Sequence, residues 1–289
     1  MTKGNNWIRE CLPHDMHRRA TVPARVNIIG EHVDNHGGLS LPFTTSDCLV
    51  LDAIQREEGY SGDEMVIRLW KEAGGYPADL RVDSRIPIGK GMSSSAALCV
   101  AIVLCSSGVN EGIETCKEAR RIEQVILEND CGLLDQIAMV FSTEEHAILI
   151  DFSDLSMKHI PLPTSWIFKL VESGIERALA ATDYGMENAY SDEHVKNEVR
   201  RVLNSIGADA EELGRLLNES HSSLVSLGVS LTEIDRIVDG LQRTDGILGA
   251  RMMGGGFGGM ILVLVENEDV LPSIPVVVSS GSARLEEVL

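Results

Sequence analysis

Short runs rich in β-branched residues alternate along this chain with longer stretches of helical periodicity, and this alternation limits the fold more than any other feature. Seven runs are typical of strands: RVNIIG, CLVLDAIQ, MVIRLW, HAILIDF, FKLVES, ILVLVEN and VVVSS. The helical stretches begin near Ser93, Glu111, Leu133, Glu187, Asp209 and Leu231. Strands and helices mixed in this way predict an α+β protein.

The length of 289 residues suits one large domain or two of ordinary size, and we expect two. Proline and serine punctuate the segment HAILIDFSDLSMKHIPLPTSW after its strand, which favours a boundary near Pro163. The N-terminal domain would span residues 1–163 and the C-terminal domain residues 164–289.

Charge and composition narrow the classes of partner and compartment. A net charge of −19 disfavours binding to nucleic acid or to an acidic membrane surface. No apolar run approaches the roughly 20 residues that span a bilayer, and the polar start does not resemble a secretory signal, so we expect a cytoplasmic protein. The six cysteines show no paired C-x-x-C spacing and are expected to be free thiols, with no zinc site. We expect a monomer or a weak homodimer.

The stretch RVNIIGEHVDNHGG, Arg25 to Gly38, crowds ionisable groups onto the end of an apolar strand. An arginine starts the run, and Glu31, His32 and Asp34 follow the buried residues. Carboxylates and imidazoles gathered at a strand end are suited to binding a polar ligand, since charged acceptors form strong hydrogen bonds with hydroxyls.

Two further stretches are rich in glycine. In PIGKGMSSSAAL, Pro87 to Leu98, glycines allow a tight turn and serines open a helix, an arrangement that can hold phosphate or can simply cap the helix. Its spacing is not that of the G-x-x-x-x-G-K-[ST] loop. In RMMGGGFGGMILVLV, Arg251 to Val265, five glycines fall within six residues, which is expected where backbone must approach closely or where a hairpin loop is flexible.

These three stretches, in this order, resemble the three motifs of the GHMP kinases, and most closely those of galactokinases. IEQVILENDCGLLDQI, LAATDYG, NESHSSL and VSLTEIDRIV resemble further segments of the same family. The resemblance implies the two-domain GHMP kinase fold, of class α+β, with an active-site cleft between the domains. It also implies transfer of the γ-phosphate of MgATP to the anomeric hydroxyl of galactose or a closely related neutral aldose.

The resemblance assigns roles to individual residues. Asp135 matches the catalytic aspartate that accepts the proton of the attacking hydroxyl, and Arg25 matches the arginine beside it, which would keep that carboxylate ionised. Ser95 and Glu123 match ligands of Mg²⁺, although neighbouring Ser94 could serve in place of Ser95.

The remaining assignments concern the two substrates. Sugar contacts are implied for Glu31, His32, Asp34, Gly132 and Tyr184. Nucleotide contacts are implied for Gly89, Gly91, Met92, Ser93, Ser94, Ser95 and Ala96. The partners are thus a small-molecule sugar and MgATP.

Two alternatives stay open. One is an anomeric kinase for a different sugar, such as an amino sugar, a pentose or a longer-chain aldose. The other is a non-catalytic, galactokinase-like sugar sensor, against which the intact SSSAA run and Asp135 count. The chain also lacks the W-x-x-Y segment that helps hold adenine in the family, so we expect its adenine pocket to be built differently or to be looser.

Overall fold

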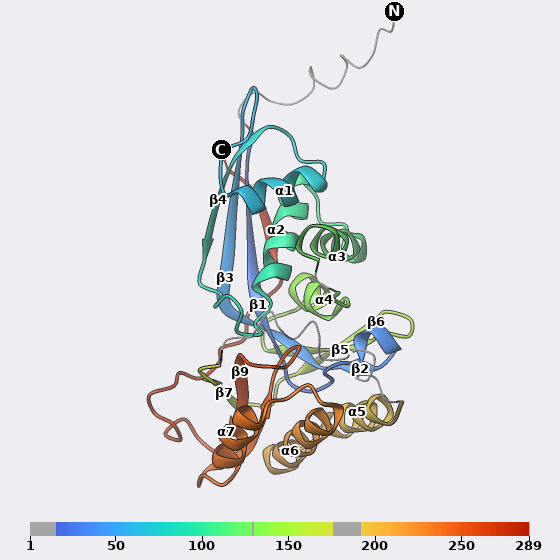
Figure 1. Ribbon diagram of the computed structural model, residues 1–289, viewed down its shortest axis with the longest axis vertical. Helices are drawn as coiled ribbons and strands as arrows, with labels where there is room; N and C mark the ends of the chain where they lie inside the picture. Colours follow the sequence, from blue (N-terminus) through green and yellow to red (C-terminus); the bar gives the residue numbers. More distant parts are fainter. Residues whose placement is uncertain (1–15, 129, 176–191, 289) are drawn as a thin grey trace, which may run out of the picture.

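Two long antiparallel strands, β1 (His17–Asn27) and β3 (Pro42–Gln55), run through the upper lobe of the molecule (Figure 1). The structure is a computed structural model and describes residues 16–128, 130–175 and 192–288. Strands β4 (Ala78–Ser84) and β10 (Arg284–Glu287) complete a sheet with the order β10-β1-β3-β4. Strand β1 therefore lies inside this sheet, and its C-terminal end is carried towards the junction between the lobes.

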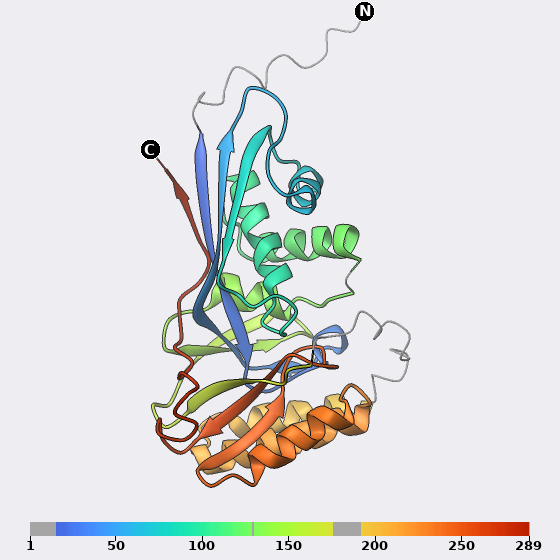
Figure 2. The same cartoon turned by 60° about the vertical axis from the view of Figure 1, so that its left-hand side comes forward.

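Four helices cover one face of this sheet (Figures 1 and 2). They are α1 (Glu64–Glu72), α2 (Ser94–Ser107), α3 (Ile113–Leu127) and α4 (Leu134–Phe141). Helix α2 is apolar on nearly every side and packs against the sheet and against α3 and α4, which explains why its sequence shows no polar face. It ends at Gly108, which takes the left-handed conformation common at helix C-termini.

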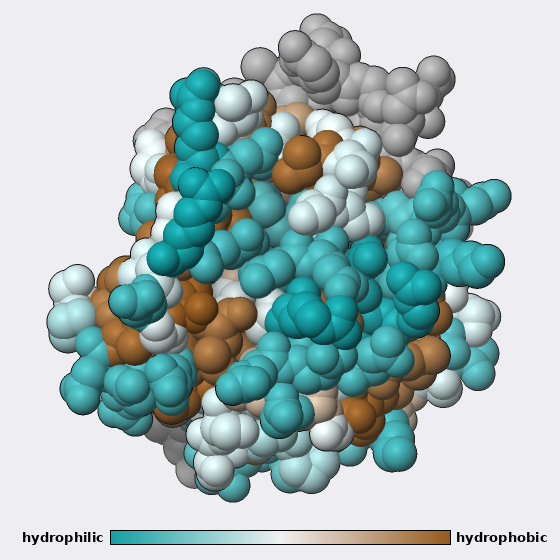
Figure 3. Space-filling view, turned by 90° about the horizontal axis from the view of Figure 1, so that it is seen from below, coloured by the Kyte–Doolittle hydropathy of each residue, from teal (hydrophilic) through white to brown (hydrophobic). Residues whose placement is uncertain are grey.

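The lower lobe is a second layered unit. A sheet of order β7-β9-β8 is formed by β7 (Ile167–Glu172), β9 (Met260–Val265) and β8 (Ile247–Met252). Helices α5 (Asp192–Ser205), α6 (Ala210–Leu227) and α7 (Thr232–Gln242) belong to this lobe. Their outer surface contributes to a largely hydrophilic lower end of the molecule, interrupted by smaller hydrophobic areas (Figure 3). The three helices thus turn their apolar faces inward.

A small sheet lies near the junction of the two lobes. Its order is β2-β5-β6, from β2 (Leu39–Ser40), β5 (His146–Asp151) and β6 (Ser156–Pro161). The single turn η2 (Asp34–His36) precedes β2. Within the described part of the chain, no helix has the length and apolar character needed to cross a membrane.

The last strand returns to the upper lobe. Thr21 of β1 lies opposite Arg284 of β10, and Arg18 lies opposite Glu287. Of the strands that follow the expected boundary at Pro163, β7, β8 and β9 form the sheet of the lower lobe, whereas β10 joins the sheet of the upper lobe. A division at residue 163 stays a prediction, and the lobes are not simply the two halves of the sequence.

Some expected elements differ from those observed. The run MVIRLW is helical, because Asp63 caps the N-terminus of α1 and Val66, Leu69 and Trp70 then fall on one buried face. The run VVVSS forms only isolated bridges. Conversely, the segment interpreted as a connection after HAILIDF is the β5–β6 hairpin, and β4, β8 and β10 were not expected from their sequences. Helical spacing outweighed β propensity in the first case.

Helix α6 lies unusually close to β8 through two glycines. A Cβ on Gly214 would come within 2.3 Å of the backbone oxygen of Leu248, and one on Gly249 would come within 2.3 Å of the backbone oxygen of Gly214. This close approach sets the distance of α6 from the strand that carries Arg251.

The same substitution should therefore have opposite effects in two helices. Gly214→Ala is expected to lower the free energy of unfolding by about 1–3 kcal/mol, because the added methyl meets backbone that must move. Gly240→Ala in α7, where a Cβ has no neighbour within 4 Å, is the matched control and should raise it by roughly 0.5–1 kcal/mol through helix propensity. Urea denaturation followed by circular dichroism measures both, and equal effects would contradict the packing role of Gly214.

Candidate active site

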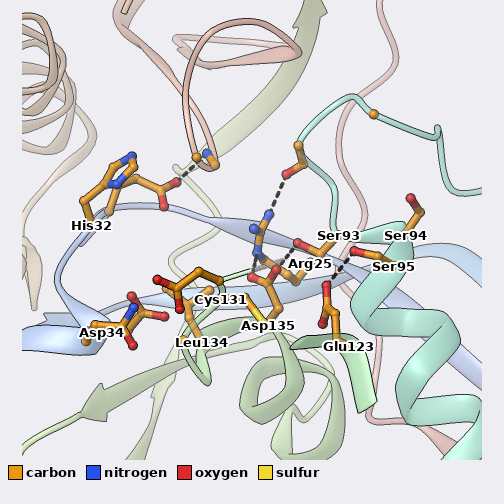
Figure 4. A pocket seen from close by; sticks show the side chains of 18 residues that line it. Arg25, His32, Asp34, Ser93, Ser94, Ser95, Glu123, Cys131, Leu134 and Asp135 are labelled. Atoms are coloured by element: carbon orange, nitrogen blue, oxygen red, sulfur yellow. Dashed lines mark hydrogen bonds and ion pairs between the residues drawn. The ribbon is translucent and has the colours of Figure 1, made fainter. Parts of the chain in front are cut away.

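A cavity of about 260 Å³ lies where the end of β1, the loop before α2, the turn before α4 and the glycine-rich loop after β8 meet (Figure 4). On one side it is lined by Arg25, Glu31, His32, Asp34, Gly132 and Asp135. On the other side it is lined by Gly89, Gly91, Ser93, Ser94, Ser95 and Glu123. The structure therefore brings together most of the residues that the sequence singled out.

Arg25 and Asp135 meet in this cavity although 110 positions separate them. The Nε atom of Arg25 donates to Oδ1 of Asp135 at 2.6 Å, and its Nη1 atom donates to the carbonyl oxygen of Gly91 at 2.7 Å. Burial opposes the charge of Arg25, but Asp135 and Glu31 outweigh it and raise the pKa of the guanidinium. The arginine is therefore a permanent cation beside the carboxylate.

The loop before α2 owes its shape to residues with positive φ. Gly89 and Gly91 have φ of 72° and 79°, and Ser93 adopts the left-handed region with φ of 61°. The hydroxyl of Ser93 donates to Oδ2 of Asp135. The first backbone N–H groups of a helix have no acceptor within the helix, so the start of α2 offers donors to an anion in this cavity.

Glu123 of α3 is almost completely buried beside the same loop. The hydroxyl of Ser95 donates to its Oε1 at 2.7 Å, and Nε2 of Gln136 donates to its Oε2 at 2.8 Å. Gln136 was not singled out from the sequence, and its place next to Asp135 on α4 is the only signal that could have drawn attention to it. Two hard oxygens, from Ser95 and Glu123, thus face the cavity together.

Glu31 connects the end of β1 with the glycine-rich loop. Its Oε1 atom accepts the backbone N–H of Gly254 at 2.8 Å and lies 3.2 Å from Nη2 of Arg251. Burial alone would raise the pKa of Glu31, but Arg251, Arg25 and the Gly254 N–H lower it below the usual value. The Glu31 carboxylate is therefore ionised within the cavity.

Asp34 lies against Gly132 in the same cavity. A Cβ on Gly132 would meet Oδ2 of Asp34 at 1.7 Å, so only glycine leaves room for this carboxylate. Burial raises the pKa of Asp34, and the nearby charges of Asp135 and Glu31 raise it further, against a hydrogen bond from the backbone of Leu134. Glu31 and Asp34 thus line one cavity with their pKa values shifted in opposite directions, downward for Glu31 and upward for Asp34.

Two of the expected site residues that the structure describes, Met92 and Ala96, do not line the cavity. The side chains of Met92 and Ala96 are buried in the hydrophobic core, so any contact with a nucleotide would have to use their backbone. Tyr184 lies outside the described residues. His32 lines the cavity with a left-handed backbone, at φ of 55°.

Comparison with protein-family models gives three matches. Residues 62–143 match the GHMP kinases N terminal domain, and residues 198–275 match the GHMP kinases C terminal domain. Residues 14–50 match the galactokinase galactose-binding signature, which includes Arg25, Glu31, His32 and Asp34. The three matches follow the order of the three motifs along the chain.

Whole-chain comparisons agree with these models. A galactokinase of Thermotoga maritima is 34% identical over 310 residues, covering 85% of this chain and 89% of that protein. A galactokinase of Thermosipho africanus is 30% identical and covers 85% of this chain and 88% of that protein. Among solved structures, the Lactococcus lactis galactokinase complexed with galactose superposes with a TM-score of 0.76 at 23% identity, covering 93% of this chain and 95% of that chain. The chain belongs to the galactokinase family of GHMP kinases.

Proposed function

We propose that this protein is an ATP-dependent galactokinase that phosphorylates the anomeric hydroxyl of galactose. The observation that carries the proposal is the contact of Arg25 with both Asp135 and the carbonyl of Gly91, because it joins a carboxylate base to the phosphate-binding loop. The relatives named galactokinase and the matched galactose-binding signature support galactose as the sugar.

Asp135 is the proposed catalytic base. Its carboxylate lines the cavity, and its side chain keeps 26% of its surface exposed, so a sugar hydroxyl can reach it. Accepting the hydroxyl proton makes the oxygen a better nucleophile towards the γ-phosphate. Arg25 is buried beside it and would stabilise the negative charge that grows on the attacking oxygen.

The nucleotide phosphates would lie against the loop from Gly89 to Ser95, where glycine backbone and the start of α2 supply N–H donors. Ser95 and Glu123 would hold Mg²⁺, since oxygen atoms are the donors that this ion prefers. Among the described residues no group of three or more His, Cys, Asp or Glu side chains could hold a metal, so phosphate oxygens and water would complete the shell. Mg²⁺ bound there would neutralise charge on the phosphates.

The sugar would lie between Glu31, His32 and Asp34, near Gly132. Galactose is a neutral ring of hydroxyl groups, and ionised carboxylates accept short, strong hydrogen bonds from hydroxyls. Tyr184 and the oligomeric state, a monomer or weak homodimer, belong to the proposal as predictions.

The function is tested by incubating the protein with MgATP and galactose and following the anomeric proton and the phosphorus signals by NMR. A new anomeric phosphate signal that grows with ADP is expected. A panel of other aldoses assayed in parallel distinguishes the alternatives. Faster turnover of another sugar than of galactose would identify that sugar as the substrate. No turnover of any sugar would favour a sugar sensor.

Asp135→Asn should lower kcat by about 10²- to 10⁴-fold, because the amide cannot accept the hydroxyl proton. Binding of MgATP, measured by isothermal titration calorimetry, should change little, since the substitution leaves the phosphate loop intact. Circular dichroism serves as the folding control. Turnover within threefold of the parent protein would rule out Asp135 as the base.

Glu123→Gln should raise the Mg²⁺ concentration needed for half-maximal activity by at least about tenfold, because the neutral amide is a weaker ligand. Glu118→Gln is the matched control on the same helix, where the carboxylate is exposed and paired with Arg121. Titration of Mn²⁺ into the ADP complex by electron paramagnetic resonance gives a readout independent of turnover. Identical curves for the two variants would contradict the metal assignment.

Asp34→Asn should weaken galactose binding and yet stabilise the fold at pH 7. The pKa of Asp34 is raised in the folded protein above its ordinary value of 3.8, so its ionisation at neutral pH costs stability that the neutral amide avoids. The gain in the free energy of unfolding should shrink as the pH falls through the pKa of Asp34 in the folded protein, and it should vanish below the ordinary pKa of 3.8. Urea denaturation at several pH values measures this, and a destabilised variant at pH 7 would contradict the electrostatic argument.

A further inference from the structure

Helix α5 places two buried side chains, one turn apart, against the backbone that leads to the sugar-side carboxylate. Oε1 of Glu198 accepts the backbone N–H of Gly30 at 3.0 Å. Nε2 of His194 lies 3.0 Å from the carbonyl oxygen of Glu31. Both side chains belong to residues that are at most 3% exposed. The lower lobe therefore contacts the backbone of two successive residues of the sugar motif.

These contacts bear on which ring nitrogen of His194 carries the proton in the neutral ring. A carbonyl oxygen can only accept a hydrogen bond, so the proton of this contact is on Nε2 of His194. The other ring nitrogen, Nδ1, lies 2.8 Å from the hydroxyl of Ser223 on α6. In the neutral ring Nδ1 is an acceptor, and the Ser223 hydroxyl donates to it. The Glu31 carbonyl therefore requires the Nε2–H tautomer, and the Ser223 hydroxyl, which can donate or accept, holds the other side of the ring.

The other anchors of this backbone act elsewhere. Arg251 donates to the carbonyl oxygens of Asn27 and Ile28, and Glu198 is itself paired with Arg201 and accepts from Ser220. Among the described residues of the lower lobe, His194 is the one that contacts the carbonyl oxygen of Glu31. Loss of that contact would leave the Glu31 carboxylate bound to Arg251 and to the Gly254 N–H, but would release the backbone that carries it.

We infer that His194, oriented by Ser223 and bound through Nε2–H to the Glu31 carbonyl, is a positioning residue for sugar recognition. It fixes the Glu31 carbonyl, and with it the direction from which the Glu31 carboxylate reaches the sugar. The inference rests on the proposed function, because Glu31 is a sugar ligand only if the cavity binds a sugar. The contacts of His194 with Ser223 and Glu31 involve neither the phosphate loop nor Asp135. Nucleotide binding is therefore predicted to be independent of His194.

The test compares four variants with the parent protein. His194→Leu removes the donor, and His194→Gln replaces it with an amide N–H donor at a similar reach. Ser223→Ala removes the hydroxyl that contacts Nδ1 and orients the ring. Ser222→Ala is the matched control, since the neighbouring Ser222 is exposed on α6 and its hydroxyl contacts only the carbonyl of Asn218 in the same helix.

His194→Leu is expected to raise the KM for galactose about tenfold, because Glu31 would no longer be fixed in its binding orientation before the sugar arrives, with the KM for MgATP within twofold. His194→Gln should recover most of the affinity. Ser223→Ala should raise the galactose KM by a smaller factor, and Ser222→Ala should change neither constant. Equal increases in both KM values, or none, would overturn the inference.

Nitrogen-15 NMR of the histidine rings gives a readout that a merely structural role would not move. The parent protein should show His194 as the Nε2–H tautomer, and Ser223→Ala should shift the Nδ1 signal without changing the tautomer. A His194 ring that carries its proton on Nδ1 in the parent protein would overturn the inference even if His194→Leu does not fold. A parent protein without activity on galactose would instead defeat the proposed function, while the tautomer result would still stand.

Discussion

The contacts of one buried guanidinium hold the site together. Arg25 projects from β1, and it binds the carboxylate of Asp135 from α4 and the carbonyl of Gly91 from the phosphate loop. A buried charge costs several kcal/mol unless it is paired and hydrogen bonded, so these contacts favour only arrangements in which strand, helix and loop converge. The proposed base and the phosphate-binding backbone are thereby placed around one point.

The glycine-rich loop after β8 completes this convergence through backbone contact. A Cβ on Gly254 would lie 3.3 Å from the Cα of Gly91, and one on Gly259 would lie 2.7 Å from the carbonyl oxygen of Lys90. That carbonyl accepts the backbone N–H of Met260. The entropy lost in ordering so many glycines is therefore offset by direct packing of one loop on another, which larger residues would prevent. The loop is a packed wall of the site.

Residues whose roles follow from their own motif could be predicted from sequence, whereas those whose partners are distant backbone atoms could not. Arg25, Glu31 and Asp135 lie in motifs, and the structure places all three in one cavity. His194 and Glu198 bind peptide groups 163 and 168 positions away, and no periodicity on α5 distinguishes them from other buried residues. The prediction of a strand for MVIRLW was wrong: the segment is helical, because a capping aspartate and a buried helical face together stabilise α1.

The opposite pKa shifts of the two sugar-side carboxylates constrain the ligand. Glu31 lies near two guanidinium groups, which hold its pKa down, whereas Asp34 is buried near Asp135 and Glu31, which raise its pKa. Among the described residues, the charges of Asp135 and Glu31 therefore act on Asp34 as a repulsion. Hydroxyl groups that donate to this carboxylate would relieve that repulsion, while a sugar acid would add another anion within a few ångströms, at a cost of more than about 1 kcal/mol. If Asp34 contacts the sugar as proposed, the same electrostatics that weaken the fold at this residue would select a neutral sugar over a uronate.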